Sequence, residues 1–129
     1  MNSGRLIKNL LREDVEDASK LLGLAINKTQ EHLFANLDIE ITSSEFKKFK
    51  RLTEERKSGK PFAYIKGSQG FYENDFLVSQ STLIPRPETE LLIDIALDNL
   101  ESEKKIKALD LGTGSGIIAI TLSEKCPKW

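Results

Sequence analysis

The sequence predicts a chain of mixed class, α+β passing into α/β, in which a small helical bundle is followed by a β-hairpin and the start of a nucleotide-binding unit. Three observations predict it. Apolar residues at spacings of three and four run through residues 1 to about 60, which is typical of amphipathic helices. Aromatic residues then flank a turn within residues 62–78. Finally, an apolar stretch at residues 106–111 leads into closely spaced glycines.

Length and composition set the limits of this interpretation. The chain has 129 residues, enough for one small domain or for one small domain and part of another. Nineteen basic and twenty acidic residues leave a net charge of -1, so global charge favours neither nucleic acid nor an anionic membrane. We see no leader and no apolar run near ~18 residues, and therefore expect a cytoplasmic protein without a membrane span. One cysteine and one histidine are too few for a zinc site, and we expect no metal.

Four short helices are predicted in the first half of the chain. Their apolar stripes are Leu6, Ile7, Leu10 and Leu11; Val15, Ala18, Leu21, Leu22 and Ala25; Leu33, Phe34 and Leu37; and Phe46, Phe49 and Leu52. We expect Asp14 to cap the second helix, and the third to begin near Asn27 or Thr29. Thr42-Ser43-Ser44-Glu45 is a capping box that starts the fourth. Short helices are marginal alone, so these should pack as a bundle.

Basic residues gather on the fourth predicted helix and just after it. They are Lys47, Lys48, Lys50, Arg51, Arg56, Lys57 and Lys60, against only Glu54 and Glu55. A solvated helix face is the more common explanation of such a cluster. A surface for a ribosomal or RNA-bearing partner is the alternative, although we do not expect direct nucleic-acid binding from this chain.

The helical pattern ends at residues 58–61, where Gly59 and Pro61 interrupt it. Phe62, Tyr64 and Ile65 then lead into Gly67, and Phe71, Phe76 and Val78 surround the turn residues Glu73-Asn74-Asp75. This pattern predicts a β-hairpin that links two domains.

A second pair of prolines predicts an extended segment followed by a helix. Pro85 and Pro87 keep the residues before them out of the helical region. Pro87 fits the first position of a helix that runs to about Leu100. We expect this helix to present Leu91, Leu92, Ile95 and Ala96 to a core.

The glycine-rich stretch predicts a strand, a tight turn and the first turns of a helix. Ile106, Ala108, Leu109 and Leu111 suit a buried strand of a parallel sheet. The motif is not the dinucleotide pattern G-x-G-x-x-G, because Gly116 comes one residue early and Ile117 stands where that pattern needs glycine. The chain also has no G-x-x-x-x-G-K-[ST] phosphate loop.

What remains is the pattern acid-x-G-x-G-x-G at residues 110–116, which resembles motif I of the Rossmann-like methyltransferases that bind S-adenosylmethionine. Other motifs occur with it in a fixed order. They are Phe62-Ala63-Tyr64-Ile65-x-Gly67, Phe71-Tyr72, Phe76-x-Val78 and Leu83-Ile84-Pro85-Arg86-Pro87-Glu88-Thr89-Glu90. Together they resemble the HemK/PrmC family, the glutamine N5-methyltransferases of peptide chain release factors. The I-P-R-P-E-T-E stretch distinguishes this family from the related ribosomal-protein glutamine methyltransferases, which remain an alternative.

The resemblance implies a binding site for S-adenosylmethionine and assigns residues to it. The loop of Gly112, Thr113, Gly114, Ser115 and Gly116 would wrap the methionine end and the ribose, and Asp110 would brace the turn and attract the cofactor's ammonium group. Arg86, Pro87, Glu88 and Thr89 would close over the same pocket. The alternative for that segment is structural, with Arg86 and Glu88 forming an ion pair at the domain junction.

The resemblance also implies a domain organisation and a partner. Residues 1–65 would form a helical substrate-recognition domain, residues 66–84 a hairpin linker, and residues 85–129 the incomplete start of the methyltransferase domain. The protein substrate would be a peptide chain release factor, and we expect a monomer.

The sequence departs from the family pattern in two places. Glu73 stands where many relatives have glycine, although Asn74 beside it can take a left-handed turn. The family's Asn-Pro-Pro-Tyr substrate motif and the acid that holds the cofactor ribose do not occur here, so no catalytic residue is expected in this chain.

A sheet with only one central strand would leave both edges unpaired, so we expect the last third of the chain to be poorly stable and the chain to be inactive alone. A non-catalytic binding module derived from such an enzyme is the main alternative function. A nicotinamide-binding fragment is a weaker one, because Gly116 is misplaced for it.

Overall fold

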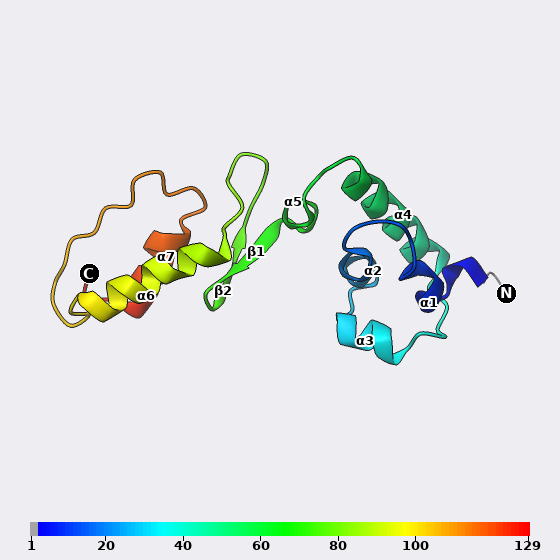
Figure 1. The fold of residues 1–129 in the computed structure, drawn as a ribbon, viewed down its shortest axis with the longest axis horizontal. Helices are drawn as coiled ribbons and strands as arrows, with labels where there is room; N and C mark the ends of the chain where they lie inside the picture. Colours follow the sequence, from blue (N-terminus) through cyan, green and yellow to red (C-terminus); the bar gives the residue numbers. More distant parts are fainter. Residues whose placement is uncertain (1–2) are drawn as a thin grey trace. The chain divides into compact units, whose positions relative to one another are not determined.

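The structure is a computed structural model and describes residues 3–129. The first two residues of the domain expected at residues 1–65 lie outside this range. The chain divides into two compact units, Met1–Lys66 and Gly67–Trp129 (Figure 1). Each unit has its own apolar core.

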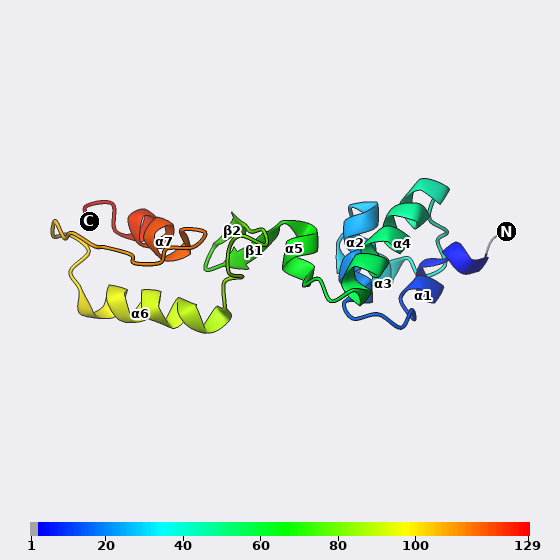
Figure 2. The same cartoon turned by 90° about the horizontal axis from the view of Figure 1, so that it is seen from above.

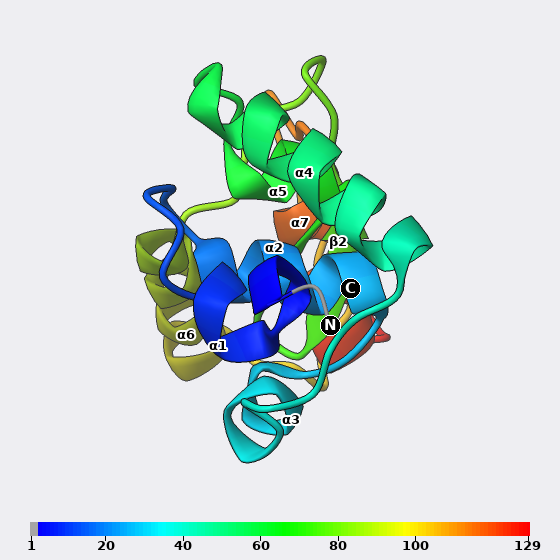
Figure 3. The ribbon, with the colours of Figure 1, turned by 90° about the vertical axis from the view of Figure 1, so that its right-hand side faces the viewer.

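The first unit is a bundle of short helices. Its elements are the 3-10 turn η1 (Ser3–Arg5) and the helices α1 (Ile7–Leu10), α2 (Ala18–Ile26), α3 (Gln30–Ala35), α4 (Ser43–Lys57) and α5 (Phe62–Lys66). Helix α4 packs across α2 (Figures 1 and 3). Side chains from four helices are fully buried between them: Ile7, Leu10, Leu21, Leu22, Leu33 and Phe49. The predicted helical bundle is therefore confirmed.

Two of the predicted helix starts are confirmed by their caps. The Thr42 hydroxyl accepts from the Glu45 N–H at 3.1 Å, and the Glu45 carboxylate accepts from the Thr42 N–H at 2.8 Å, which completes the predicted capping box. Thr29 caps α3 by accepting from the His32 N–H at 3.2 Å. Asn27 does not begin that helix; it ends α2 in the left-handed conformation.

The prediction that Asp14 caps the second helix is wrong. Helix α2 begins at Ala18, and the residue at its N-cap is Asp17, with φ of 62° and no side-chain hydrogen bond that caps the helix. The carboxylate of Asp17 instead contacts Arg56 of α4. The carboxylate that stands at the N-cap is thus engaged in a long-range ion pair and does not cap the helix.

Two further expectations for the first unit were wrong. Phe34 and Leu37 do not join Leu33 in the core and are exposed. Phe34 follows Leu33 directly and so lies about 100° around the helix from it, and Leu37 lies beyond the end of α3 at Ala35. The helical pattern does not end at residues 58–61 as expected, because residues 62–66 form a further helix, α5. The Pro61 carbonyl accepts from Tyr64 and Ile65, and Phe62 and Ile65, three residues apart, pack on the bundle core.

The second unit contains a hairpin and two longer helices. Its elements are β1 (Ser68–Phe71), β2 (Asn74–Leu77), the 3-10 turn η2 (Pro87–Thr89), α6 (Glu90–Asn99) and α7 (Ile117–Lys125). The strands pair antiparallel, with Phe71 opposite Asn74 and Ser68 opposite Leu77. Helices α6 and α7 lie side by side (Figures 1 and 2). Phe71, Phe76 and Ile93 form the buried centre.

The hairpin exists, but its turn lies earlier than predicted. The turn residues are Tyr72 and Glu73, and Tyr72, not Asn74, takes the left-handed conformation with φ of 57°. Asn74 belongs to β2. The prediction of Pro87 at the first position of a helical turn is confirmed, although that turn is a 3-10 helix which passes directly into α6.

The strand expected at residues 106–111 is not formed. Within the described part of the chain, residues 105–109 make no hydrogen bond to another backbone group, and Leu109 and Leu111 are each 84% exposed. A strand requires a neighbour, and the described residues provide only the two-stranded sheet of the hairpin. A Rossmann-like sheet therefore remains a prediction.

The helix after Pro87 buries a different face from the one predicted. Leu91, Leu92 and Ile95 are exposed, whereas Ile93 is fully buried. Ile93 points to the hairpin aromatics, which are the apolar neighbours available to it in this unit. Most of the predicted face is therefore exposed within the described residues.

Candidate functional site

The glycine loop and the proline segment of the second unit line one pocket of about 190 Å³. Its lining consists of Leu83, Ile84, Pro85, Arg86, Thr89, Gly112, Thr113, Gly114, Ser115, Ile117 and Ile118. Two stretches that are more than twenty residues apart in sequence therefore face one space. Six of the ten predicted site residues lie in this wall: Arg86, Thr89, Gly112, Thr113, Gly114 and Ser115.

The remaining four predicted residues lie beside the pocket. Gly116 is the N-cap of α7. Pro87 and Glu88 are exposed in η2, and Asp110 lines a neighbouring cleft. A hydrogen bond joins this cleft to the loop, because the Thr113 hydroxyl donates to the Asp110 carboxylate at 2.8 Å. That bond spans Gly112 and fixes the acid relative to the turn.

The backbone of the loop explains why glycine is needed in it. Gly112 and Gly114 have φ of 71° and 59°, in the left-handed region that side chains disfavour. A Cβ at either position would meet no atom within 4 Å. The requirement at these two positions is therefore conformational, and the space above both is open.

The proline segment keeps its shape without the ion pair considered for it. Arg86 is extended, with φ of -97° and ψ of 140°, and its carbonyl accepts from the Thr89 N–H at 3.0 Å. Neither Arg86 nor Glu88 has an ion-pair partner among the described residues, and both are exposed. The guanidinium group of Arg86 is thus available at the pocket wall.

Sequence reasoning missed the apolar part of the wall. Leu83 and Ile84 precede the prolines, and Ile117 and Ile118 begin α7. The sequence signal that could have predicted this wall is the apolar pair that precedes the proline motif and the apolar pair that follows the glycine motif. No side chain caps the first turn of α7, so its N–H groups are not occupied by a local cap.

A second cleft, of about 250 Å³, lies between residues 108–110 and α7. It is lined by Ala108, Leu109, Asp110, Ile118, Ala119, Leu122, Ser123 and Trp129. The Trp129 indole N–H donates to the Glu101 carbonyl at 3.3 Å. Most of this lining is apolar.

Tyr72 joins the hairpin to both long helices of the second unit. Its N–H donates to the Glu90 carboxylate at 2.7 Å, and its hydroxyl donates to Asp94 at 2.5 Å. The Lys125 ammonium lies 5.4 Å from the ring centroid and pairs with Glu73 at 2.8 Å. The hydrogen bond to Asp94, with smaller effects of burial and of nearby acids, raises the pKa of Tyr72 to about 12.

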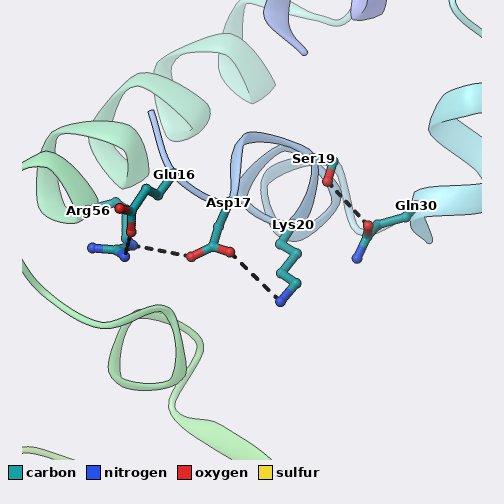
Figure 4. A network of polar contacts seen from close by, with 6 residues as sticks. All are labelled: Glu16, Asp17, Ser19, Lys20, Gln30 and Arg56. Atoms are coloured by element: carbon teal, nitrogen blue, oxygen red, sulfur yellow. Dashed lines mark hydrogen bonds and ion pairs between the residues drawn. The ribbon is translucent and has the colours of Figure 1, made fainter. Parts of the chain in front are cut away.

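In the first unit, three of the seven basic residues on and after α4 are held by acids. Arg56 contacts Asp17 at 3.3 Å and also Glu16, within the polar network drawn in Figure 4. Lys50 pairs with Glu13, and Lys60 with Glu55. The remaining four are exposed and have no ion-pair partner within residues 3–129: Lys47, Lys48, Arg51 and Lys57.

Two other findings limit the kind of site. Residues 3–129 contain no group of three or more His, Cys, Asp or Glu arranged to hold a metal. In the same range, no helix has the length and apolar character required to cross a bilayer.

The geometry defines a protein of two units: a helical unit comes first, and the unit that follows it has a pocket lined by glycines. The family model described as PrmC N-terminal domain matches residues 3–67, half of the chain. The chain belongs to the PrmC family.

Relatives extend the likeness beyond the first unit. A release factor glutamine methyltransferase of Coxiella burnetii is 39% identical over 113 residues, covering 88% of this chain and 41% of the relative. That of Koribacter versatilis is 42% identical over 111 residues, covering 86% and 40%. A bifunctional methyltransferase of Rickettsia prowazekii is 37% identical over 129 residues, covering 86% and 25%. The chain spans about two fifths of the length of the first two.

Proposed function

We propose that this chain supplies the helical unit and the cofactor pocket of an S-adenosylmethionine-dependent methyltransferase that acts on a glutamine side-chain amide of a peptide chain release factor. The observation that carries the proposal is the pocket in which Gly112–Ser115 and Leu83–Arg86 face one another. Family membership and the names of the relatives support the reaction and the substrate. We also propose that the protein is cytoplasmic and monomeric. Its domains would be the helical recognition domain at residues 1–65, the hairpin linker at 66–84 and the start of the methyltransferase domain at 85–129.

The residues around the pocket suit a cofactor with an ammonium group, a ribose and a flat aromatic base. The Asp110 carboxylate, held by Thr113, would attract the ammonium group. Backbone groups of Gly112–Gly116 would approach the ribose without a Cβ in the way. Arg86, Pro87, Glu88 and Thr89 would cover the cofactor, and Ile117 would contribute apolar wall. When bound, the cofactor supplies an electrophilic sulfonium methyl group.

The pocket is incomplete for a ligand of this size. Its volume of about 190 Å³ is below the roughly 300 Å³ at which small-molecule sites usually begin. A glutamine amide is a weak nucleophile, and its reaction depends on positioning, which can lower a barrier by about 7 to 11 kcal/mol. We assign no catalytic residue in this chain and expect no methyl transfer from it alone.

A pair of glycine variants tests the cofactor proposal. Gly114→Ala and Gly59→Ala both place a side chain at positive φ, and both have open space for the Cβ, but only Gly114 lines the pocket. We expect S-adenosylhomocysteine, titrated into the labelled chain, to shift the amide resonances of residues 110–118 weakly. Gly114→Ala should reduce the affinity at least tenfold and Gly59→Ala should leave it unchanged. Equal affinity in both variants, or no shift at millimolar ligand, would contradict the proposal.

A non-catalytic binding module is the second candidate function, and the exposed cations of α4 favour it. Lys47, Lys48 and Arg51 lie on the solvent side of one helix and are not neutralised by an acid among the described residues. A Lys47→Glu, Lys48→Glu, Arg51→Glu variant should weaken release-factor binding and reduce its salt dependence. The matched control reverses three cations of the same unit outside α4, Arg12, Lys28 and Lys66. If both variants bound the release factor with equal affinity, the three α4 cations would have no role beyond solvation of the helix surface.

A further inference from the structure

We propose that the groove between β2 and α7 binds an extended, basic segment of the protein substrate. The groove has a volume of about 430 Å³. Residues 74–77 of β2 form one wall, and Ser115, Ile120 and Glu124 form the other. The identity of the partner rests on the proposed function, whereas the chemistry of the bound segment follows from the groove itself.

The open edge of β2 provides the first argument, because it can pair with an added strand. The Val78 N–H donates to the Gly67 carbonyl across the hairpin at 3.0 Å. In an antiparallel ladder every second residue points its backbone groups at the partner strand, so Asp75 and Leu77 point theirs away from β1. Neither residue has another backbone partner within residues 3–129. Their N–H and C=O groups can therefore bond to an extended peptide.

Two acids in the groove provide the second argument, because they select the charge of that peptide. Asp75 has neither an ion pair nor a side-chain hydrogen bond among the described residues. Glu124 accepts from the Asn74 amide at 2.5 Å, but no cation in the described part of the chain pairs with it. The neighbouring Lys125 is held by Glu73 at 2.8 Å. A basic peptide would complement both exposed carboxylates.

Two exposed aliphatic side chains make the other end of the groove apolar. Leu77 is 85% exposed and lies on the same face of β2 as Asp75, since residues two apart share a face. Ile120 is 43% exposed, one turn nearer to the glycine loop than Glu124. Its Cδ1 atom would lie 3.1 Å from a Cβ added at Gly116. The groove is therefore acidic near the hairpin turn and apolar near the glycine loop.

The position of the groove indicates which segment would occupy it. Ser115 lines both this groove and the pocket proposed for the cofactor. A segment with basic residues at Asp75 and apolar residues at Leu77 would run toward the proposed methyl donor, where positioning of the substrate matters most. A second copy of this chain is a poor occupant, because pairing two β2 edges would bring their acids together.

The experiment titrates the whole chain into a fluorescein-labelled peptide in which a valine pair stands between two lysine pairs, and it measures anisotropy. No cofactor is added. We expect saturable binding that is at least tenfold weaker when glutamate replaces lysine. It should also be at least tenfold weaker when alternate backbone nitrogens of the peptide are methylated. Amide exchange at Asp75 and Leu77 should slow severalfold on binding, which a contact with side chains alone would not produce.

A charge reversal tests the selectivity of the groove without relying on loss of binding alone. Asp75→Lys should weaken binding of the lysine peptide at least tenfold and strengthen binding of the glutamate peptide. Asp98→Lys is the matched control, because Asp98 is an exposed acid of α6 that has no ion-pair partner among the described residues and does not line the groove. It should leave both affinities unchanged. Both variants should keep the circular dichroism of the parent chain.

A full-length release factor should displace the labelled peptide. The proposal would be overturned by no binding at millimolar peptide, by equal affinity for the two peptides, by equal effects of the two reversals, or by a release factor that binds the chain without displacing the peptide. Failure of the proposed function looks different. The peptide would still bind with the expected selectivity, but neither S-adenosylhomocysteine nor the release factor would bind the chain.

Discussion

The bond between Thr113 and Asp110 shows how a single side chain organises the glycine loop. This bond spans Gly112, and it therefore holds the Asp110 carboxylate in place against the backbone turn of the loop. The residue types of this loop could be predicted from sequence, since the spacing of the acid and the glycines is local. The apolar wall could not, because it depends on Leu83 and Ile84 approaching α7 from a distant part of the chain.

Removing the hydroxyl of Thr113 should affect the ligand more than the fold. Thr113→Val loses the bond to Asp110, and because the site is exposed we expect the free energy of unfolding to change by less than about 1 kcal/mol. Affinity for S-adenosylhomocysteine should fall severalfold, measured by titration. Thr113→Ser, which keeps the hydroxyl, should retain the parent affinity. A serine variant as weak as the valine variant would contradict a role for the bond.

The ionisation of Tyr72 gives a prediction with a defined direction. Asp94 accepts from the phenol and so stabilises its neutral form, which raises the pKa of Tyr72 to about 12. The contribution to stability is complete below the unfolded value of about 10 and is lost as pH rises from there through about 12. Asp94→Asn should lower the pKa seen in an ultraviolet titration. Tyr72→Phe identifies the signal, and an unchanged midpoint in Asp94→Asn would rule out the assigned cause.

Among the helices, α4 was the most predictable because its start signal is local. The capping box and the apolar spacing of Phe49 and Leu52 lie within one segment. The start of α2 was predicted wrongly, because Asp17 is placed by Arg56 from a helix that follows much later. The hairpin turn was misplaced for the same reason: contacts of Tyr72 with Glu90 and Asp94 override the preference of Asn74 for a left-handed turn.

Loss of the cap on α4 should destabilise the first unit by a small and measurable amount. Thr42→Ala removes the acceptor for the Glu45 N–H and should cost about 1 kcal/mol of unfolding free energy in urea. Ser44→Ala changes a residue two positions further on, whose exposed side chain makes no hydrogen bond among the described residues. It should stay near the parent value. Equal destabilisation in the two variants would mean that composition, not capping, determines the start of α4.

At the level of the whole chain, the two cores differ in extent. Among the described residues, the first core contains nine buried apolar residues, whereas the hairpin core contains three. The change from helices to hairpin could be predicted from the sequence. Whether a strand forms at residues 106–111 could not, since pairing depends on a neighbour that these residues do not themselves supply.

We expect the two units to unfold separately, with the second unit at the lower urea concentration. Leu22→Ala should lower the first unit's stability by about 2 to 5 kcal/mol and leave amide exchange in the hairpin unchanged. Ile93→Ala should do the reverse. Mass spectrometry of hydrogen exchange, read peptide by peptide along a urea series, measures both. A single shared transition, moved equally by both variants, would contradict the division into independent units.

The position of Trp129 has a practical consequence. It is the chain's only tryptophan, and its ring lines the apolar cleft beside Leu109 and α7 while its indole N–H contacts the Glu101 carbonyl. Its fluorescence therefore reports on water in this cleft and requires no attached dye. Emission should move to shorter wavelength whenever water is excluded from the cleft, so its occupancy could be followed in real time at micromolar concentration.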